Sequence, residues 1–130
     1  MASARNTLIA YVSDGENKAD TLSKAGAELI KVESSDGKVC IKQLLRYLAE
    51  RGINEVVVEA GQMLNGALFA LHLVDEFLFY YAPSLLGADA RGMLAFAELQ
   101  SMQERTQLSI IDVRQLGQDI RIRAKPISKP

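Results

Sequence analysis

Short apolar runs separated by polar turns make up the first third of the chain. Thr7–Ser13 and Glu28–Glu33 are rich in aliphatic and β-branched residues, which predicts two strands. Asn17–Ala25 lies between them with small apolar side chains on one side, so we expect a helix that Gly26 ends. Ser34–Lys38 is polar and is predicted to be a loop.

Two helices are predicted from apolar residues that recur three and four positions apart. The apolar face of the first consists of Ile41, Leu44, Leu45 and Leu48. Arg51 and Gly52 are expected to close this helix, with a cation in the last turn and glycine just beyond it. The second helix opens at Gly61, and its predicted face consists of Leu64, Ala67, Leu68 and Leu71.

The remaining runs predict strands. Glu55–Val58 is almost wholly β-branched without alternation, which is typical of a strand covered on both faces of a parallel sheet. Asp75–Ala82 is aromatic-rich, while Ser109–Arg114 and Asp119–Lys125 flank a turn at Gly117. The order predicts an α/β fold: a mainly parallel sheet flanked by helices, with a C-terminal antiparallel hairpin, in a single domain over residues 1–130.

Composition narrows the class of protein. The 130 residues are 48% apolar and 24% charged, with a net charge of -1, so nothing indicates a nucleic-acid partner. No uninterrupted apolar stretch is long enough for a bilayer, so no membrane partner is expected. Cys40 is the single cysteine, which favours a reducing, cytoplasmic compartment and a small packed side chain.

The stretch from Val56 to Ala67 carries the most informative chemistry. A predicted buried strand ends in Glu59-Ala60-Gly61, and a helix follows directly. Ligands of α/β proteins bind at the carboxyl ends of strands, and a helix N-terminus offers free N–H groups to phosphate. Glu59 would then point into the crevice. Spacing alone nevertheless favours a plain tight turn at Gly61 and a helix-dipole role for Glu59, because a lone glycine turn is weak evidence.

Other polar residues have simpler interpretations. Asp75 and Glu76 are expected at a solvated strand end. Arg121, Arg123 and Lys125 form one face of a strand that we expect at a solvated edge. His72 has no second ligand at metal spacing and is interpreted as a helix-end residue. No catalytic residue and no metal site are predicted.

A family resemblance emerges from the second half of the chain, residues 54–126. VVVEAGQMLNGALFALHLVDEFLFYYAPSLLGADARGM and the tail DVRQLGQDIRIRAKP resemble the reductase domain of the bacterial bifunctional riboflavin-biosynthesis deaminase/reductase. Taken together and in this order, these motifs are specific to that family. Residues 7–53 fit the order of elements but contribute no motif.

The resemblance implies a dihydrofolate-reductase-like fold. It also implies NADPH-dependent reduction of the ribosyl chain of 5-amino-6-(5-phosphoribosylamino)uracil, a pyrimidine ribosyl phosphate, by a homodimer. Glu59 matches a substrate-binding glutamate of the family. The residues that match the pyrophosphate-binding turn and helix start are Gly61, Gln62, Met63, Leu64, Asn65, Gly66 and Ala67. The resemblance therefore favours a ligand site over a plain turn.

Two departures from the family pattern change the expectation. The family commonly has Pro and a small residue where this chain has Gln62 and Met63, which reduces rigidity at the helix start. The family's upstream Lys-containing strand and its deaminase domain are absent, so we expect a C-terminal piece that is inactive alone. The alternative is a non-catalytic α/β module for dimerisation or nucleotide binding.

Overall fold

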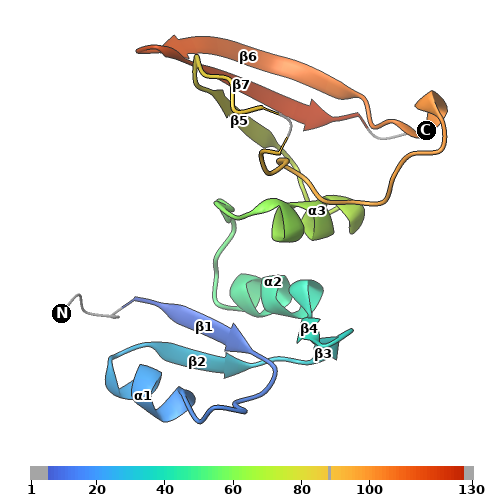
Figure 1. Ribbon diagram of the computed structural model, residues 1–130. Coiled ribbons are helices and arrows are strands. Elements are labelled where there is room, and N and C mark those ends of the chain that lie inside the picture. The colour runs from blue at the N-terminus through green and yellow to red at the C-terminus, as the bar shows by residue number, and fades with distance from the viewer. Residues whose placement is uncertain (1–5, 88, 128–130) are drawn as a thin grey trace. The chain divides into compact units, whose positions relative to one another are not determined.

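The computed structural model describes residues 6–87 and 89–127, and the chain divides into two compact units, Met1–Val57 and Val58–Pro130. The elements of both are labelled in Figure 1. The fold is α/β. In the described residues, no helix combines the length and apolar character that a membrane span needs.

The first unit is built on a two-stranded parallel sheet. β1 (Leu8–Tyr11) pairs with β2 (Glu28–Lys31), and α1 (Ala19–Lys24) connects them. Gly26 ends α1 with a φ of 97°, a conformation that glycine adopts without strain. These elements confirm the predicted strand–helix–strand order.

A small hairpin and a longer helix complete this unit. β3 (Ser34–Ser35) and β4 (Lys38–Val39) pair antiparallel around Asp36 and Gly37, so the predicted loop is wrong in part. α2 (Ile41–Glu50) confirms the first predicted helix, and Gly52 follows its end at a φ of 80°.

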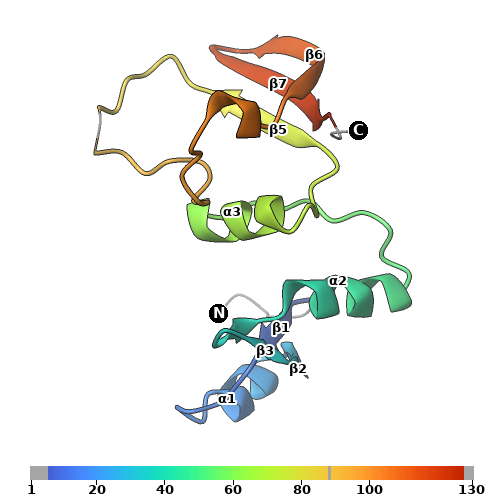
Figure 2. The same ribbon diagram turned by 90° about the vertical axis from the view of Figure 1, so that its right-hand side faces the viewer.

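Figure 2 shows the ribbon of helix α2. Polar contacts hold this helix to β2. Arg51 Nη1 donates to Glu28 Oε1 at 2.8 Å, and the Tyr47 hydroxyl donates to the same oxygen at 3.2 Å. The backbone N–H of Glu33 donates to Gln43 Oε1 at 2.6 Å. Glu28 also raises the pKa of Arg51, first through the hydrogen bond and then through its charge.

The second unit contains a three-stranded antiparallel sheet of order β5–β7–β6. Its strands are β5 (Phe77–Tyr81), β6 (Leu108–Leu116) and β7 (Asp119–Pro126). Gly117, at a φ of 63°, turns the chain between β6 and β7, which confirms the predicted hairpin. A register shift between Ile110 and Asp112 marks a bulge in β6.

Helix α3 (Gln62–Ala70) packs against this sheet through aromatic rings. The Phe69 ring lies 6.2 Å from Phe77 and 5.0 Å from Phe96, measured between centroids. Leu68 is buried, but Leu64 and Leu71 are exposed, so the predicted apolar face of this helix is only partly right. His72 follows α3 at a φ of 55°, which confirms its place at a helix end. A short 3-10 helix, η1 (Met102–Glu104), precedes β6.

The predicted strand at Glu55–Val58 is wrong. In the described part of the chain this segment has no regular secondary structure and pairs with no strand, and Val57 is 68% exposed. A strand needs a neighbour for its backbone hydrogen bonds, and apolar composition alone does not supply one. Among the described sheets only β1–β2 is parallel, so the expected mainly parallel sheet is not confirmed.

The position expected for the basic strand face is also wrong. β7 is the central strand of its sheet rather than a solvated edge. Arg121 and Arg123 are half-buried because each pairs with a carboxylate of a neighbouring element. Glu76 lies 47 residues before Arg123 in the chain, which explains why a local pattern could not place this strand.

Candidate functional site

The candidate site is the turn that leads into α3. Gly61 is the N-cap residue, with extended backbone angles of φ -80° and ψ 170°, and its carbonyl accepts the first helical hydrogen bond from the Asn65 N–H at 3.1 Å. Glu59 and Gly61 are exposed, and Ala60 is half-buried. The predicted site residues therefore adjoin one helix terminus.

The first turn of α3 presents unsatisfied N–H groups. The amides of Gln62, Met63 and Leu64 precede the first residue that can bond within the helix. Among the described residues no side chain caps this terminus, and no acidic residue lies in its first turn. The aligned peptide dipoles add partial positive charge at the same place. The terminus is therefore suited to an anionic ligand.

Two glycines of this stretch differ in their surroundings. A Cβ added at Gly61 would meet no described atom within 4 Å, so the space beside it is open. A Cβ added at Gly66 would lie 1.8 Å from the Ala95 carbonyl oxygen. Gly66 thus lets the backbone around Ala95 pack directly on α3, a contact that the sequence did not reveal.

Hydrogen bonds hold the segment Met93–Ala95 to the start of α3. The Ala95 N–H donates to the Gln62 carbonyl at 2.9 Å. Asn65 Nδ2 donates to the Ala60 carbonyl at 3.0 Å and to the Met93 carbonyl at 3.4 Å. Sequence reasoning included Asn65 as part of a motif but missed these contacts, because Met93 is distant in the chain.

Ion pairs stabilise the sheet of the second unit. Arg123 binds Glu76 with two hydrogen bonds, Nε to Oε1 at 2.8 Å and Nη2 to Oε2 at 3.1 Å. This hydrogen bonding lowers the pKa of Glu76, against a smaller opposing effect of desolvation. Arg121 lowers the pKa of Asp112 in the same way. Glu76, predicted to be solvated, directly precedes β5 and therefore links the start of that strand to β7.

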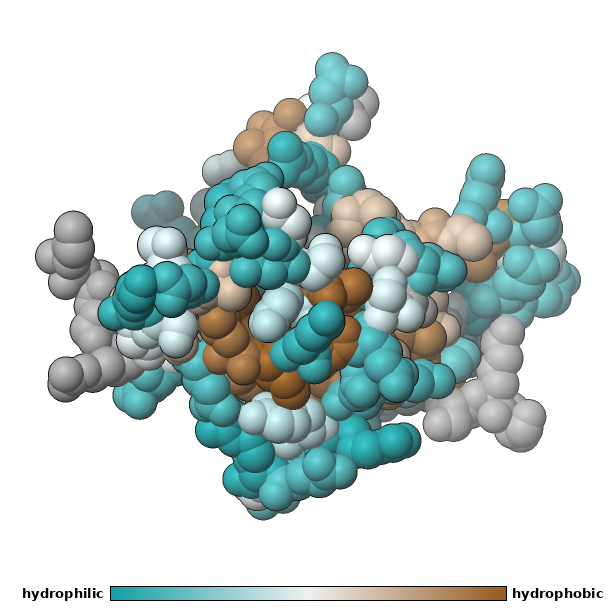
Figure 3. Space-filling view, turned by 90° about the horizontal axis from the view of Figure 1, so that it is seen from below, coloured by the Kyte–Doolittle hydropathy of each residue, from teal (hydrophilic) through white to brown (hydrophobic). Residues whose placement is uncertain are grey.

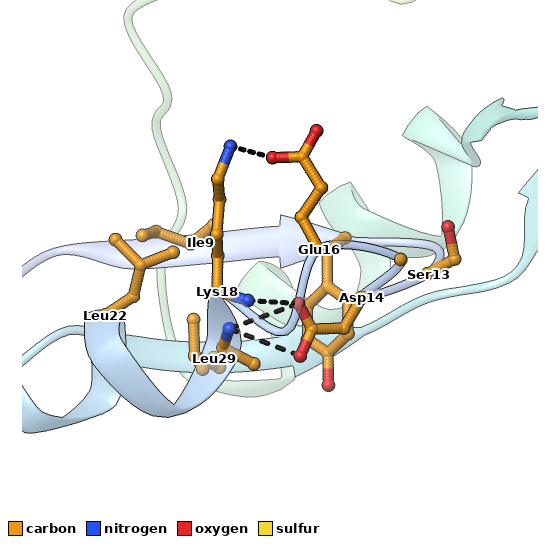
Figure 4. A pocket seen from close by; sticks show the side chains of 10 residues that line it. Ile9, Ser13, Asp14, Glu16, Lys18, Leu22 and Leu29 are labelled. Atoms are coloured by element: carbon orange, nitrogen blue, oxygen red, sulfur yellow. Dashed lines mark hydrogen bonds and ion pairs between the residues drawn. The ribbon is translucent and has the colours of Figure 1, made fainter.

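A hollow of about 400 Å³ lies beside β1 and α1 in the first unit. Ile9, Leu22 and Leu29 line it, with Asp14 and Lys18 among its polar residues (Figure 4). Seen from below, apolar residues gather in the middle of the molecular surface with polar residues around them (Figure 3).

The charged groups of this hollow already have partners. The Asp14 carboxylate accepts the backbone N–H of Lys18 at 2.7 Å and that of Ala19 at 3.2 Å, and Lys18 pairs with Glu16. The hollow is therefore the weaker candidate of the two. Among the described residues no group of three or more His, Cys, Asp or Glu could hold a metal ion.

An open glycine with extended backbone angles and an uncapped helix terminus form the arrangement that α/β proteins use for phosphate-containing ligands. The RibD C-terminal domain is the family whose model matches this chain, over residues 2–122. The chain belongs to that family.

Curated relatives carry names from riboflavin biosynthesis. The riboflavin biosynthesis protein RibD of Haemophilus influenzae is 38% identical over 86 residues, which are 66% of this chain and 23% of that protein. A Buchnera aphidicola protein named 5-amino-6-(5-phosphoribosylamino)uracil reductase is 35% identical over 89 residues, 68% of this chain and 43% of that protein. The chain spans between about a quarter and a half of the length of these two relatives.

A solved structure supports the same relationship. RibD of Acinetobacter baumannii superposes with a TM-score of 0.76 and 30% identity, over 92% of this chain and 31% of that one. The family match over residues 2–122 includes residues 7–53, where the sequence contributed no motif.

Proposed function

We propose that this chain is part of an NADPH-dependent 5-amino-6-(5-phosphoribosylamino)uracil reductase of riboflavin biosynthesis. The observation that carries the proposal is the uncapped first turn of α3 behind Gly61, which suits a pyrophosphate. The name of the Buchnera relative supplies the substrate and the reaction class. The cofactor, when bound, supplies the hydride that reduces the ribosyl chain of the substrate.

Each predicted site residue has a role in this proposal. The backbone amides of Gln62, Met63 and Leu64 bind the pyrophosphate, and Gly61 leaves room for it. Gly66 and Ala67 belong to the same helix start, where Gly66 also has the packing role described above. Glu59 is exposed and is proposed to bind the pyrimidine ribosyl phosphate substrate.

The proposal also covers the fold, the compartment and the assembly of the whole protein. In this proposal residues 1–130 belong to a single dihydrofolate-reductase-like domain that acts in the cytoplasm as a homodimer. The opposing proposal is a non-catalytic module of the same fold that dimerises or binds a nucleotide without turnover.

Gly61→Ala tests the cofactor site. The substitution meets no described atom and Gly61 lacks a positive φ, so the unfolding midpoint should stay within about two degrees. The added methyl group would stand where the pyrophosphate approaches, so the Kd for NADPH, followed by its fluorescence, should rise about tenfold, equivalent to about 1.4 kcal/mol. Unchanged NADPH affinity would place the cofactor elsewhere.

Glu59→Gln tests the substrate site in the intact enzyme. We expect kcat/KM to fall while the unfolding midpoint changes by no more than about two degrees, because an exposed carboxylate has little packing to lose. Glu55→Gln, at another exposed glutamate, is the matched control and should leave both values unchanged. Full activity with reduced stability in Glu59→Gln would give Glu59 a structural role, and NADPH binding without any turnover in the wild-type protein would favour the non-catalytic module.

A further inference from the structure

Asn65 lies in the first half of α3, and its side chain leaves the helix to bind two carbonyl groups. The amide nitrogen donates to the carbonyl of Ala60, just before the helix, and to that of Met93, which lies 28 residues further along the chain. Asparagine is among the weaker helix formers, so a helical asparagine with two backbone partners has a function other than helix propensity.

We propose that Asn65 is a positioning residue that aims the backbone N–H of Gly61 at the cofactor's pyrophosphate. The inference rests on the proposed function and extends it to a residue that need not touch the ligand through its side chain. This role follows from the planarity of the peptide bond between Ala60 and Gly61.

The carbonyl of Ala60 and the N–H of Gly61 belong to the same peptide unit. In a trans peptide these two groups point in opposite directions, and the unit is rigid. Asn65 draws the Ala60 carbonyl toward α3 with a hydrogen bond of 3.0 Å. The Gly61 N–H is thereby turned away from the helix and joins the free amides of the first turn as a further donor.

The second hydrogen bond ties the neighbouring segment to the same residue. Met93 accepts from Asn65 at 3.4 Å, and two residues later the Ala95 N–H donates to the Gln62 carbonyl. Ala95 also lies against Gly66. Asn65 thus holds both the turn and the segment beside it, and neither a serine nor an aspartate could do so. Serine has one donor on a shorter side chain, and an ionised aspartate has none.

Asn65→Ala in the full chain is the main test, with Asn54→Ala as the matched control at an exposed asparagine. We expect Asn65→Ala to raise the Kd for NADPH about tenfold and Asn54→Ala to leave it unchanged. Alanine favours the helix and offsets part of the lost hydrogen bonding, so the variant should remain folded. Asn65→Asp, which keeps the size but not the donors, should weaken binding at least as much and serves as the second variant if the first does not fold.

A measurement without cofactor separates this inference from the proposed function. Amide hydrogen exchange at Ala95 should be faster in Asn65→Ala than in wild type, because the Met93 anchor is lost, and unchanged in Asn54→Ala. In nitrogen–proton spectra of the wild type, the Gly61 amide should shift on addition of NADP⁺, and this shift should be lost in Asn65→Ala, which a purely structural role would not predict.

The outcomes are distinct. If wild type binds NADPH and Asn65→Ala binds it equally well, the positioning role is overturned and the proposed function stands. If wild type binds no NADPH while Ala95 exchange still responds to Asn65→Ala, the proposed function fails and with it the role toward the cofactor, leaving Asn65 as a structural contact.

Discussion

Gly61 caps the start of α3 and Gly66 lies within it, yet the two differ in whether the fold requires glycine. Gly61 has an ordinary φ and open space beside it, so the described fold does not demand glycine there. Gly66 is required by packing, because the Ala95 backbone occupies the place of a side chain. A sequence motif joins such residues because it records which types occur together, without recording the reason for each.

Gly66→Ala is predicted to destabilise the chain strongly. The added Cβ would meet the Ala95 carbonyl oxygen at 1.8 Å and its carbon at 2.5 Å, and both are backbone atoms that cannot move alone. Overpacking of this kind costs about 1–3 kcal/mol or more. The free energy of unfolding, measured with urea, should fall by at least about 2 kcal/mol. Gly15→Ala is the control, since no atom of the described residues lies within 4 Å of its Cβ position. Equal stability of both variants would contradict the packing role.

Local sequence patterns predicted individual helices and the hairpin correctly. They did not predict how strands that are distant in the chain pair. The apolar spacing of α2 and the glycines after α1 and α2 were sufficient to place those helices and their ends. The β6–β7 hairpin followed from alternation and Gly117. Glu55–Val58 failed because β-branched composition cannot specify a partner strand. β7 was misplaced because its central position depends on β5, whose paired residues lie about forty positions earlier in the chain.

The candidate site, like the fold, could be predicted from the sequence only where its residues are contiguous in the chain. The sequence located the turn and the helix start, since both are contiguous in the chain. It did not reveal the contacts of Asn65 and Gly66 with Met93 and Ala95, which lie about thirty residues further on. Tertiary packing between segments distant in the chain sets these contacts, and a local sequence pattern does not specify it.

The Glu76–Arg123 pair predicts a pH-dependent link between the start of β5 and β7. Because Arg123 lowers the folded-state pKa of Glu76, the pair stabilises the fold fully above the ordinary glutamate pKa of about 4.3 and loses this effect as the pH falls through the folded-state value. Glu76→Gln should be less stable than wild type near pH 7, and the difference should shrink as the pH falls below about 4.3 and through the folded-state pKa of Glu76. Urea midpoints across this range provide the measurement, with Glu98→Gln, at an exposed glutamate, as the control. A difference that persists at the lowest pH would exclude the carboxylate as its source.

At the scale of the whole molecule, the sheet of the second unit leaves apolar surface uncovered. Register places Ile120, Ile122 and Ala124 on the face that β5 shares through Phe77, Phe79 and Tyr81. α3 contacts this face at Phe77 through Phe69. Toward the β6–β7 turn and on β6, the exposed fractions remain 47% for Tyr81, 45% for Ile120 and 57% for Val113. Contiguous apolar surface of this kind marks an interaction site in soluble proteins.

We therefore expect the chain to self-associate, with a two-fold dimer as the simplest assembly. Light scattering over a concentration series should give a mass above the 14.3 kDa of one chain, rising toward twice that value. Val113→Lys places a charge on the apolar face and should shift the mass toward the monomer. Leu78→Lys, on the opposite face of the same sheet where Arg121 and Arg123 lie, should leave association unchanged. A wild-type mass of one chain at the highest concentration would show that β5 and β6 are protected edges, and that their exposed apolar residues are tolerated without a partner.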